Sequence, residues 1–393
     1  MKSKIKVLFY IWAYVSFSQL STATEFIPLG FLDADDRVSS AVAVDVVGDA
    51  VVGESVVNGQ VTAFVWRQNN GMLPLEFANG AVIANSISAD GQVIIGRART
   101  AQSSNGESFL TGSSQAFTLI GSLVATPTGS SAQDVSADGS VVAGWSPSSS
   151  KAFEAYRWTQ QHGLEPLGTL LGGANYSIAN AIAPDGDVIV GESGSVEGTQ
   201  AFRWSQADGM SGIGDLAGGN FSSTALDVSD NGKVIVGDSS SAQGLEAFRW
   251  DEVSGMTGLG HLSTTSPRST ALSVAIDGSV IVGTSGDADA TAFIWDQSHG
   301  MRSLQDFLAA DPNLIGDLNG WHLIAAQGVS ANGQAIVGRG YNPEGQVEAF
   351  LVRLDAPLSV PEPRTLGLLA SCCAICHCAI KHRRIPGRER RRE

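Results

Sequence analysis

Residues 230–250 read DNGKVIVGDSSSAQGLEAFRW, and residues 184–204 read almost the same, PDGDVIVGESGSVEGTQAFRW. Each stretch has an Asn-Gly or Asp-Gly pair, a short apolar segment, a polar loop and a segment in which two aromatic residues stand two positions apart. Asn-Gly and Asp-Gly beside apolar runs are the strongest short-range hairpin signal, because both central residues of a type I′ turn need positive φ. The stretch therefore predicts a tight turn of that type, followed by two antiparallel strands.

The same pattern occurs seven times along the chain. Its apolar segment ends each time in a glycine, at Gly53, Gly96, Gly144, Gly191, Gly237, Gly283 and Gly338. Successive glycines are 43 to 55 residues apart, and another glycine stands five residues before each of them. Such a period indicates a repeat architecture in which each repeat is one supersecondary unit.

Each repeat contains four short strands. The aromatic strand has a tryptophan in five copies, Trp66, Trp158, Trp204, Trp250 and Trp295, and a fourth strand follows about eleven residues after the aromatic residues. Four strands in about 46 residues is the size of one propeller blade. A helical solenoid would show a period of 3.6 residues, which is absent. The sequence predicts an all-β fold, a seven-bladed β-propeller of four-stranded blades over residues 24–357.

The two ends of this domain complement each other. The seventh repeat stops after its aromatic strand and has no fourth strand, whereas an extra fourth strand, FIPLGFL, stands at residues 26–32. Leu29-Gly30 matches Leu167-Gly168, and both pairs precede the next turn glycine by the same spacing. We expect this N-terminal strand to complete the last blade and close the ring, so that no unpaired edge is left there.

The repeated tryptophans have two interpretations. Phe202 and Trp204, two residues apart on a strand, point to the same side. Both faces of a blade are covered by neighbours in a propeller, so these aromatics are expected to pack between blades. The alternative is a ring of exposed tryptophans that stack on sugars. Arg157, Arg203 and Arg249, each just before a tryptophan, are expected to pair with acidic residues of the same or the next blade, for which Asp134 and Asp227 are candidates. Recognition of a ligand is the alternative.

Charge and cysteine usage exclude two classes of protein. Residues 24–360 contain 13 basic and 36 acidic residues, a net charge of −23. Such a surface repels phosphate backbones, so no nucleic-acid partner is expected. All four cysteines lie between residues 372 and 378. The body therefore has neither a disulfide framework nor a cysteine-ligated metal.

No catalytic, cofactor or metal site is predicted. No phosphate-binding loop, G-x-S-x-G or H-E-x-x-H motif occurs, and the histidines of the body stand singly in different repeats. The Asp-Gly turns offer one carboxylate each, too few for calcium. Residues 32–36 and 286–291 are the only aspartate clusters and weak calcium candidates. A longer insertion before the last repeat contains Trp321 and His322, a weak candidate for a ligand loop.

The two ends of the chain have the patterns of targeting signals. Three early lysines, an apolar run from Val7 to Phe17 and small residues up to Ala23 predict a secretory signal peptide over residues 1–23, cleaved after Ala23. A membrane anchor is the alternative, but the run is short for a span. Residues 358–393 contain Val360, Pro361, Glu362 and Pro363, then an apolar segment and an arginine-rich end.

This C-terminal order resembles the PEP-CTERM sorting signal. The resemblance implies that the segment holds an exported protein transiently in the membrane, as a short helix, until an exosortase cleaves it, in bacteria that make exopolysaccharide. The basic end after Arg384 is longer than usual in that family. Residues Cys373 to His377 match the C-x-x-C-H motif to which a c-type haem is attached. No surrounding domain would enclose a haem, so no haem is expected.

The repeats resemble the extracellular HAF family through the pattern DGxVIVGxS, EAFRW and GMxxLGxL. The histidine that the family has before Ala-Phe is replaced here by Glu, Thr, Gln or Ser. The resemblance implies a surface repeat protein and no particular activity. The sequence thus predicts an exported, non-enzymatic propeller at the cell surface or in a matrix, with an exosortase and possible exopolysaccharide or protein partners. The alternative is an extracellular carbohydrate-active enzyme with carboxylates at a channel mouth.

Overall fold

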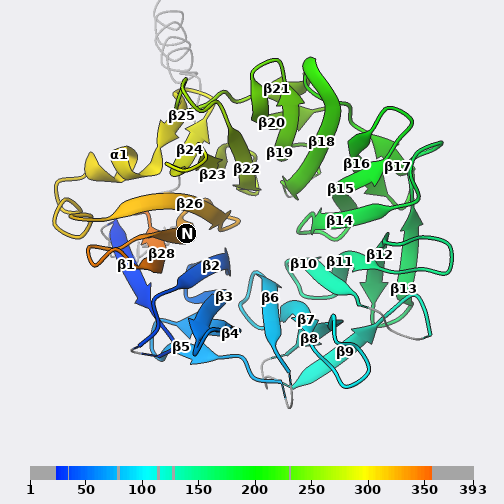
Figure 1. Cartoon of the computed structure of the whole chain (residues 1–393), viewed down its shortest axis with the longest axis horizontal. Helices are drawn as coiled ribbons and strands as arrows, with labels where there is room; N and C mark the ends of the chain where they lie inside the picture. Colours follow the sequence, from blue (N-terminus) through cyan, green and yellow to red (C-terminus); the bar gives the residue numbers. More distant parts are fainter. Residues whose placement is uncertain are drawn as a thin grey trace, which may run out of the picture.

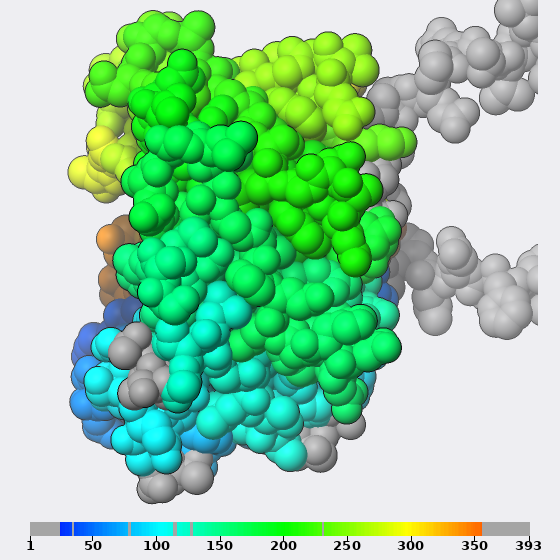
Figure 2. Space-filling view, turned by 90° about the vertical axis from the view of Figure 1, so that its right-hand side faces the viewer, coloured from blue at the N-terminus to red at the C-terminus, as the bar shows by residue number. Residues whose placement is uncertain are grey.

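The computed structural model describes residues 24–33, 35–77, 80–112, 116–125, 129–229 and 232–355. These residues form a ring of β-sheets around a central channel, and the chain passes from one sheet to the next in order (Figure 1). The flank of the ring shows consecutive repeats, from cyan to yellow-green, lying against one another (Figure 2). The signal peptide over residues 1–23 and the sorting segment over residues 358–393 lie outside the described residues.

The first three repeats form separate four-stranded antiparallel sheets. The strands of the first are β2 (Ser39–Val44), β3 (Ala50–Val57), β4 (Gln60–Arg67) and β5 (Gly71–Pro74). The second contains β6 (Val82–Ile87), β7 (Ile94–Ala98), β8 (Glu107–Thr111) and β9 (Phe117–Gly121). The third contains β10 (Ser131–Val135), β11 (Val141–Ser146), β12 (Glu154–Thr159) and β13 (Gly163–Gly168).

The later repeats keep the same strand order. The fourth has β14 (Ser177–Ile182), β15 (Val188–Gly194), β16 (Thr199–Ser205) and β17 (Gly209–Gly212), and the fifth has β18 (Gly218–Val228), β19 (Ile235–Ser241), β20 (Gly244–Asp251) and β21 (Gly255–Gly258). The sixth has β22 (Ser269–Val274), β23 (Val280–Ser285), β24 (Thr291–Asp296) and β25 (Gly300–Ser303). The last sheet joins β26 (His322–Val329), β27 (Ala335–Tyr341) and β28 (Val347–Arg353) to β1 (Glu25–Gly30).

The prediction of seven separate four-stranded blades needs a correction. The described residues form five such sheets and one eight-stranded sheet, in which the fourth and fifth repeats are joined. The junction is a single parallel bridge between Thr199 of β16 and Ser222 of β18. Isolated parallel bridges also link Phe153 to Tyr176 and Val38 to Val347. The fourth and fifth repeats form one sheet because β18 is longer than the other inner strands, so that the bridge to Thr199 falls within a strand.

The predicted closure by the N-terminal strand is confirmed. β1 pairs antiparallel with β28, with Phe26 opposite Val352 and Ile27 opposite Leu351. Ser39 then links the first repeat to this sheet: its hydroxyl donates to the carbonyl of Gly30 at 2.7 Å and accepts from the amide of Ala349 at 2.9 Å. Antiparallel pairing with β1 satisfies the outer edge of β28, so the ring closes non-covalently.

Serines make equivalent links inside the ring. Ser177 donates to the carbonyl of Gly168 at 2.6 Å and accepts from the amide of Ala155 at 3.0 Å. Ser223 and Ser269 make the same pair of hydrogen bonds to the blades that precede them. All three serines are buried, where a hydroxyl needs such partners. The junction made by Ser39 therefore has the same chemistry as the junctions between consecutive repeats.

The repeat glycine lies within each second strand, and a close approach of the inner strand requires it there. A Cβ atom on Gly191 would lie 1.9 Å from the carbonyl oxygen of Ile178, and the other six repeat glycines show the same contact at 2.0 to 2.2 Å. No side chain fits at that distance. The seven glycines are thus packing positions, and their recurrence reports the constant spacing of two strands.

The aromatic strands supply the core, as the packing interpretation predicted. Their aromatic residues before the tryptophan position are all fully buried: Phe64, Phe109, Tyr156, Phe202, Phe248, Phe293 and Phe350. Trp66 is buried, and the other four tryptophans are half-buried against hydrophobic clusters between repeats. Burying an aromatic side chain of this size stabilises the fold by about 1.5–3 kcal/mol. The exposed ring of sugar-stacking tryptophans is not present.

The turns differ from the expected type I′. The turn glycines have positive φ, for example 69° at Gly91, but Asn58 is the only non-glycine residue with positive φ among the described residues. Gly91 donates its amide to the carbonyl of Ser88, and the Asp90 carboxylate accepts from the amide of Gln92 at 3.0 Å. The aspartate thus stabilises the turn through its side chain, with only the glycine in the left-handed region.

The insertion before the last repeat folds against the closing sheet. In the sixth repeat the fourth strand β25 ends at Ser303, which caps the short helix α1 (Leu304–Ala309) by accepting from the amide of Asp306. Leu308, Leu314, Leu318 and Trp321 lie in one buried cluster with Phe26 of β1. The insertion therefore covers the point at which the ring closes.

Candidate functional site

The central channel is lined by the innermost strand of every repeat. It forms a cavity of about 410 Å³ whose walls include residues of β2, β6, β10, β14, β18, β22 and β26. Each of these strands has an alanine opposite the repeat glycine, and the pairing register shifts directly after that alanine, for example between Ala132 and Asp134. A bulge re-aims a side chain. The repeated bulge therefore gives the channel wall a set of equivalent positions, one per repeat.

The bulged residues are Val42, Asn85, Gln133, Asn180, Leu226, Leu272 and Gln327. Four of them are amides, and these bond to neighbouring repeats. Asn85 donates to the carbonyl of Ala132 at 2.7 Å and to the side chain of Gln133 at 3.1 Å. Asn180 donates to the carbonyl of Ala225 at 2.9 Å. These amides connect the inner strands around part of the channel.

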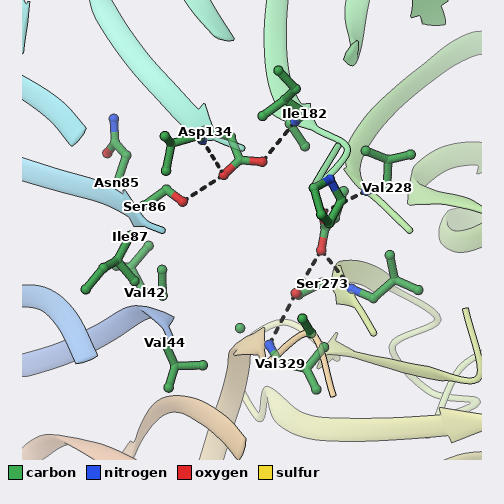
Figure 3. A pocket seen from close by; sticks show the side chains of 18 of the residues that line it. Val42, Val44, Asn85, Ser86, Ile87, Asp134, Ile182, Val228, Ser273 and Val329 are labelled. Carbon is green, nitrogen blue, oxygen red and sulfur yellow. Dashed lines mark hydrogen bonds between the residues drawn. The ribbon is translucent and has the colours of Figure 1, made fainter. Parts of the chain in front are cut away.

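Two aspartates occupy the position after the bulge. The Asp134 carboxylate accepts from the Ser86 hydroxyl at 2.7 Å, from its neighbour Val135 at 2.8 Å and from the amide of Ile182 at 2.9 Å (Figure 3). Ser86 belongs to the preceding repeat and Ile182 to the following one. One carboxylate therefore connects three consecutive repeats.

Asp227 makes a corresponding set of contacts. Its carboxylate accepts from the amide of Val228 at 2.7 Å, and from the hydroxyl of Ser273 and the amide of Val274 at 2.8 Å each. Ser273 in turn accepts from the amide of Val329 at 3.2 Å, and Figure 3 shows Ser273 and Val329 on the channel wall. All oxygens of both carboxylates are engaged by groups of the chain itself.

Both aspartates have a raised pKa. Burial among the inner strands raises the pKa of Asp134 to about 6, against the hydrogen bonds that favour its charged form. Burial also raises the pKa of Asp227 to about 7, and the negative charge of Asp134 adds to that rise. The two carboxylates therefore influence each other across the channel, and they titrate near neutral pH.

Charged side chains also recur at the position directly after the repeat glycine on the second strand of most repeats. The residues that follow the repeat glycines are Glu54, Arg97, Trp145, Glu192, Asp238, Thr284 and Arg339. Burial raises the pKa of Glu54, while Arg97 and Arg339 on either side lower it. Burial raises the pKa of Asp238 to about 6, opposed mainly by a hydrogen bond from Thr270. These side chains lie toward the blade end opposite the Asp-Gly turns.

The predicted pairing of the arginines with acidic residues is confirmed, but the candidates Asp134 and Asp227 were wrong. Arg157 pairs with Glu165 at 3.4 Å, and Arg203 with Asp208 at 3.9 Å, each within its own blade. Arg249 pairs with Asp251 on the same strand. The arginines lie on the outer strands, whereas the inner strands hold Asp134 and Asp227 in the channel wall, out of their reach.

The candidate ligand loop is also corrected. Trp321 is only 7% exposed and packs edge-on against Phe26, with ring centroids 5.0 Å apart. Its ring is therefore part of the core and not open to a ligand. His322 is exposed and stacks on Tyr341, and its Nε2 lies 3.2 Å from the carbonyl of Ala290. The pair does not form one site.

The weak calcium candidates do not form a ligand set in the described ranges, which contain no group of three or more His, Cys, Asp or Glu that could hold a metal ion. Asp287 instead pairs with Arg268 at 3.5 Å, and Asp36 accepts from the amide of Asp33 at 3.2 Å. Ala23 and Val360 to Pro363 lie outside the described residues, so the cleavage and sorting predictions stay predictions. No helix in the described part of the chain has the length and apolarity of a membrane span.

A groove between the second and third repeats was missed by the sequence analysis. Its volume is about 380 Å³, and its lining includes Arg97, Arg99, Trp145 and Phe153. Phe153 is 41% exposed and meets Trp145 edge-on at 5.0 Å. The signal was present in the alignment of the repeats, since Trp145 is the only aromatic residue that follows a repeat glycine.

Comparisons with known proteins show the fold. No protein-family model and no curated protein matches the chain. Among solved structures, the chain is similar to the β-propeller domain of the Trilobed protease from Pyrococcus furiosus, with 10% identity and a TM-score of 0.52 over 83% of this chain and 100% of that one. At this identity the likeness shows a β-propeller and nothing finer.

Two further solved structures are similar at lower scores. An oligogalacturonate lyase from Vibrio parahaemolyticus has 11% identity and a TM-score of 0.48 over 84% of this chain and 97% of that one. TolB from Acinetobacter baumannii has 13% identity and a TM-score of 0.44 over 69% of this chain. The match covers 63% of that TolB, less than two thirds of its length.

Proposed function

We propose that the chain is an exported, non-enzymatic β-propeller that serves as a binding and structural scaffold at the cell surface or in a biofilm matrix. The observation that carries this proposal is the bonding of the two channel carboxylates. Every oxygen of Asp134 and Asp227 accepts from an amide or serine of the wall. Groups held in this way connect blades, and no oxygen of either carboxylate is left without a partner in the wall.

The ring is proposed to act as seven blades. The two halves of the eight-stranded sheet, β14–β17 and β18–β21, each keep the strand order of a separate blade. One parallel bridge joins them, and hydrophobic cores lie between repeats on both sides of that bridge. A rigid ring with many exposed loops is a suitable support for binding surfaces.

A carbohydrate-active enzyme is the second candidate function. One observation favours it: two carboxylates with pKa values of about 6 and about 7 line the same cavity. Carboxylates tuned toward neutral pH are typical of general acid–base catalysis. Against it stands the geometry, because a catalytic acid needs a free oxygen directed at the substrate, and the wall occupies these oxygens.

Export and tail processing are part of the proposal and rest on the sequence. The apolar run between the Pro-Glu-Pro triplet and the basic end is about 15 residues long, shorter than the roughly 20 of a stable span. The basic cluster would stay on the cytoplasmic side. Pro361, Glu362 and Pro363 would then lie just outside the membrane, within reach of an exosortase.

Replacing Pro361, Glu362 and Pro363 by alanine is expected to leave a larger species in the membrane fraction, while the wild type is released or passed to the surface. Fractionation and immunoblotting of both forms in the native host check this. Alanine at Ser359 and Leu358 is the matched control and should not change processing. Equal release of both proteins at equal mass would contradict the proposed sorting step.

A further inference from the structure

The groove between the second and third repeats differs in charge from the rest of the body. Its lining contains two arginines and no aspartate or glutamate, although residues 24–360 have a net charge of −23. Two acids near the groove have other partners, since Glu107 accepts from Thr100 and Glu154 pairs with Lys151 at 2.7 Å, whereas Glu54 interacts electrostatically with Arg97. The groove is therefore a local site for an anionic group on an acidic protein.

The two arginines have their guanidinium groups available. Neither Arg97 nor Arg99 forms an ion pair with an acidic residue within the described ranges. Arg97 is half-buried on β7, where Glu54 lies near enough to interact electrostatically, and Arg99 is exposed at the start of the following loop. A planar guanidinium matches a carboxylate with two parallel hydrogen bonds.

The opposite wall of the groove is aromatic. Trp145 comes from β11 of the third repeat, and Phe153 lies just before β12; their rings meet at an interplanar angle of 84°. Two perpendicular rings offer a ring face and a ring edge to the same space. The negatively charged face of an aromatic ring attracts the polarised C–H groups of a sugar ring. Ser104 and Asn105 line the groove as well, and the exposed Ser104 adds a hydroxyl group.

We propose that this groove binds a uronic acid residue of an acidic polysaccharide, with Trp145 and Phe153 against the sugar ring and Arg97 and Arg99 at its carboxylate. The inference rests on the proposed scaffold function and names its ligand class. Phe153 and Arg99 in the lining of the groove are exposed, so a residue within a long chain can enter it. Its position is separate from the channel, and binding here leaves the blade-connecting aspartates undisturbed.

The test uses the folded body, residues 24–355, and titration calorimetry with oligomers of mannuronate, glucuronate and galacturonate. Neutral oligomers of the corresponding hexoses, at equal length, are the comparison. At least one oligouronate is expected to bind at least about tenfold more tightly than its neutral counterpart, since hydrogen bonds to charged groups are stronger than those between neutral groups. Added salt should weaken this binding.

Three variants test whether the binding is in the groove. Arg97→Gln and Arg99→Gln should each weaken oligouronate binding about tenfold, and Trp145→Thr should weaken both acidic and neutral sugars. Thr284 already occupies the position of Trp145 in the sixth repeat, so this change suits the blade. Arg339→Gln is the matched control, because Arg339 occupies the Arg97 position in the last repeat and does not line the groove.

The outcomes separate this inference from the proposed function. Oligouronate binding that none of the three groove variants changes would overturn the groove and leave the scaffold standing. Absence of binding by all three oligouronates would overturn the groove as well. Shortening of the oligouronates during the titration would instead contradict the scaffold function, wherever they bind.

Discussion

Removing residues 24–32 is expected to lower the stability of the whole ring by about 4–6 kcal/mol. The deletion removes Phe26 and Leu29, each 6% exposed, and burial of such side chains contributes about 1.5–3 kcal/mol apiece. It also exposes the edge of β28 and removes the carbonyl of Gly30 that accepts from Ser39. A loss of this size is a large part of the 5–15 kcal/mol typical of a folded protein.

Thermal unfolding of the intact and truncated bodies, followed by circular dichroism, measures this effect. The truncated body should melt roughly 10 °C lower, and a synthetic peptide of residues 24–32 added in excess should restore part of the difference. Pro28→Ala is the matched control, because Pro28 lies in the same strand but is exposed. Melting of the truncated body within about 2 °C of the intact one would show that β1 does not close the ring.

The second large effect is the pH dependence given by Asp227. Its pKa is raised from 3.8 to about 7 in the fold, so the folded state holds a proton that the unfolded state has released between these values. The unfolding free energy should therefore fall as the pH rises from about 4 to about 7, by roughly 1–3 kcal/mol. Asp134, with a pKa of about 6, contributes in the same direction.

Urea unfolding at several pH values tests this dependence. Asp227→Asn should flatten the slope between pH 4 and pH 7, because asparagine resembles the protonated aspartate and does not titrate. Asp138→Asn is the control: Asp138 is exposed in a turn, and the hydroxyl of Ser136 and the amide of Ser140 lower its pKa. Its own contribution is therefore lost as the pH falls below about 4. An unchanged slope in Asp227→Asn would contradict the assigned pKa.

The sequence predicted most of the ring because its determinants are local. The turn glycines, the strand glycines and the buried aromatics recur at fixed spacing, and each has a packing reason visible within one repeat. The closing strand was predictable because FIPLGFL at residues 26–32 duplicates a strand that the last repeat lacks. These features need no knowledge of how one repeat meets another.

Features that depend on contacts between repeats could not be predicted. Asp134 connects three repeats through Ser86 and Ile182, both 48 residues away in the sequence. The local sequence around Asp134 does not distinguish this role from that of an ion-pair partner for arginine. The merged sheet depends on the length of β18, which the repeat pattern does not show. The insertion was read as a loop for ligands, but its apolar side chains, including Trp321, fill a core.

The groove is an intermediate case. Trp145 was visible as a deviation once the residues after the repeat glycines are compared, but its meaning depends on Arg97 and Phe153. These residues come from two repeats and a loop, and only the ring geometry brings them together. A residue that departs from the repeat pattern is thus a useful indication of a binding site, but its surroundings depend on the residues of the neighbouring repeat.

The central claim, that the propeller binds without catalysing, is tested most directly by the chain length of an acidic polysaccharide. Long polyuronates incubated with the folded body at pH 5, 6 and 7 should keep their length by size-exclusion chromatography and release no new reducing ends. This pH range covers the titration of Asp134 and Asp227. Shortening of any polyuronate that disappears in Asp134→Asn or Asp227→Asn would contradict the account and establish the channel as an active site.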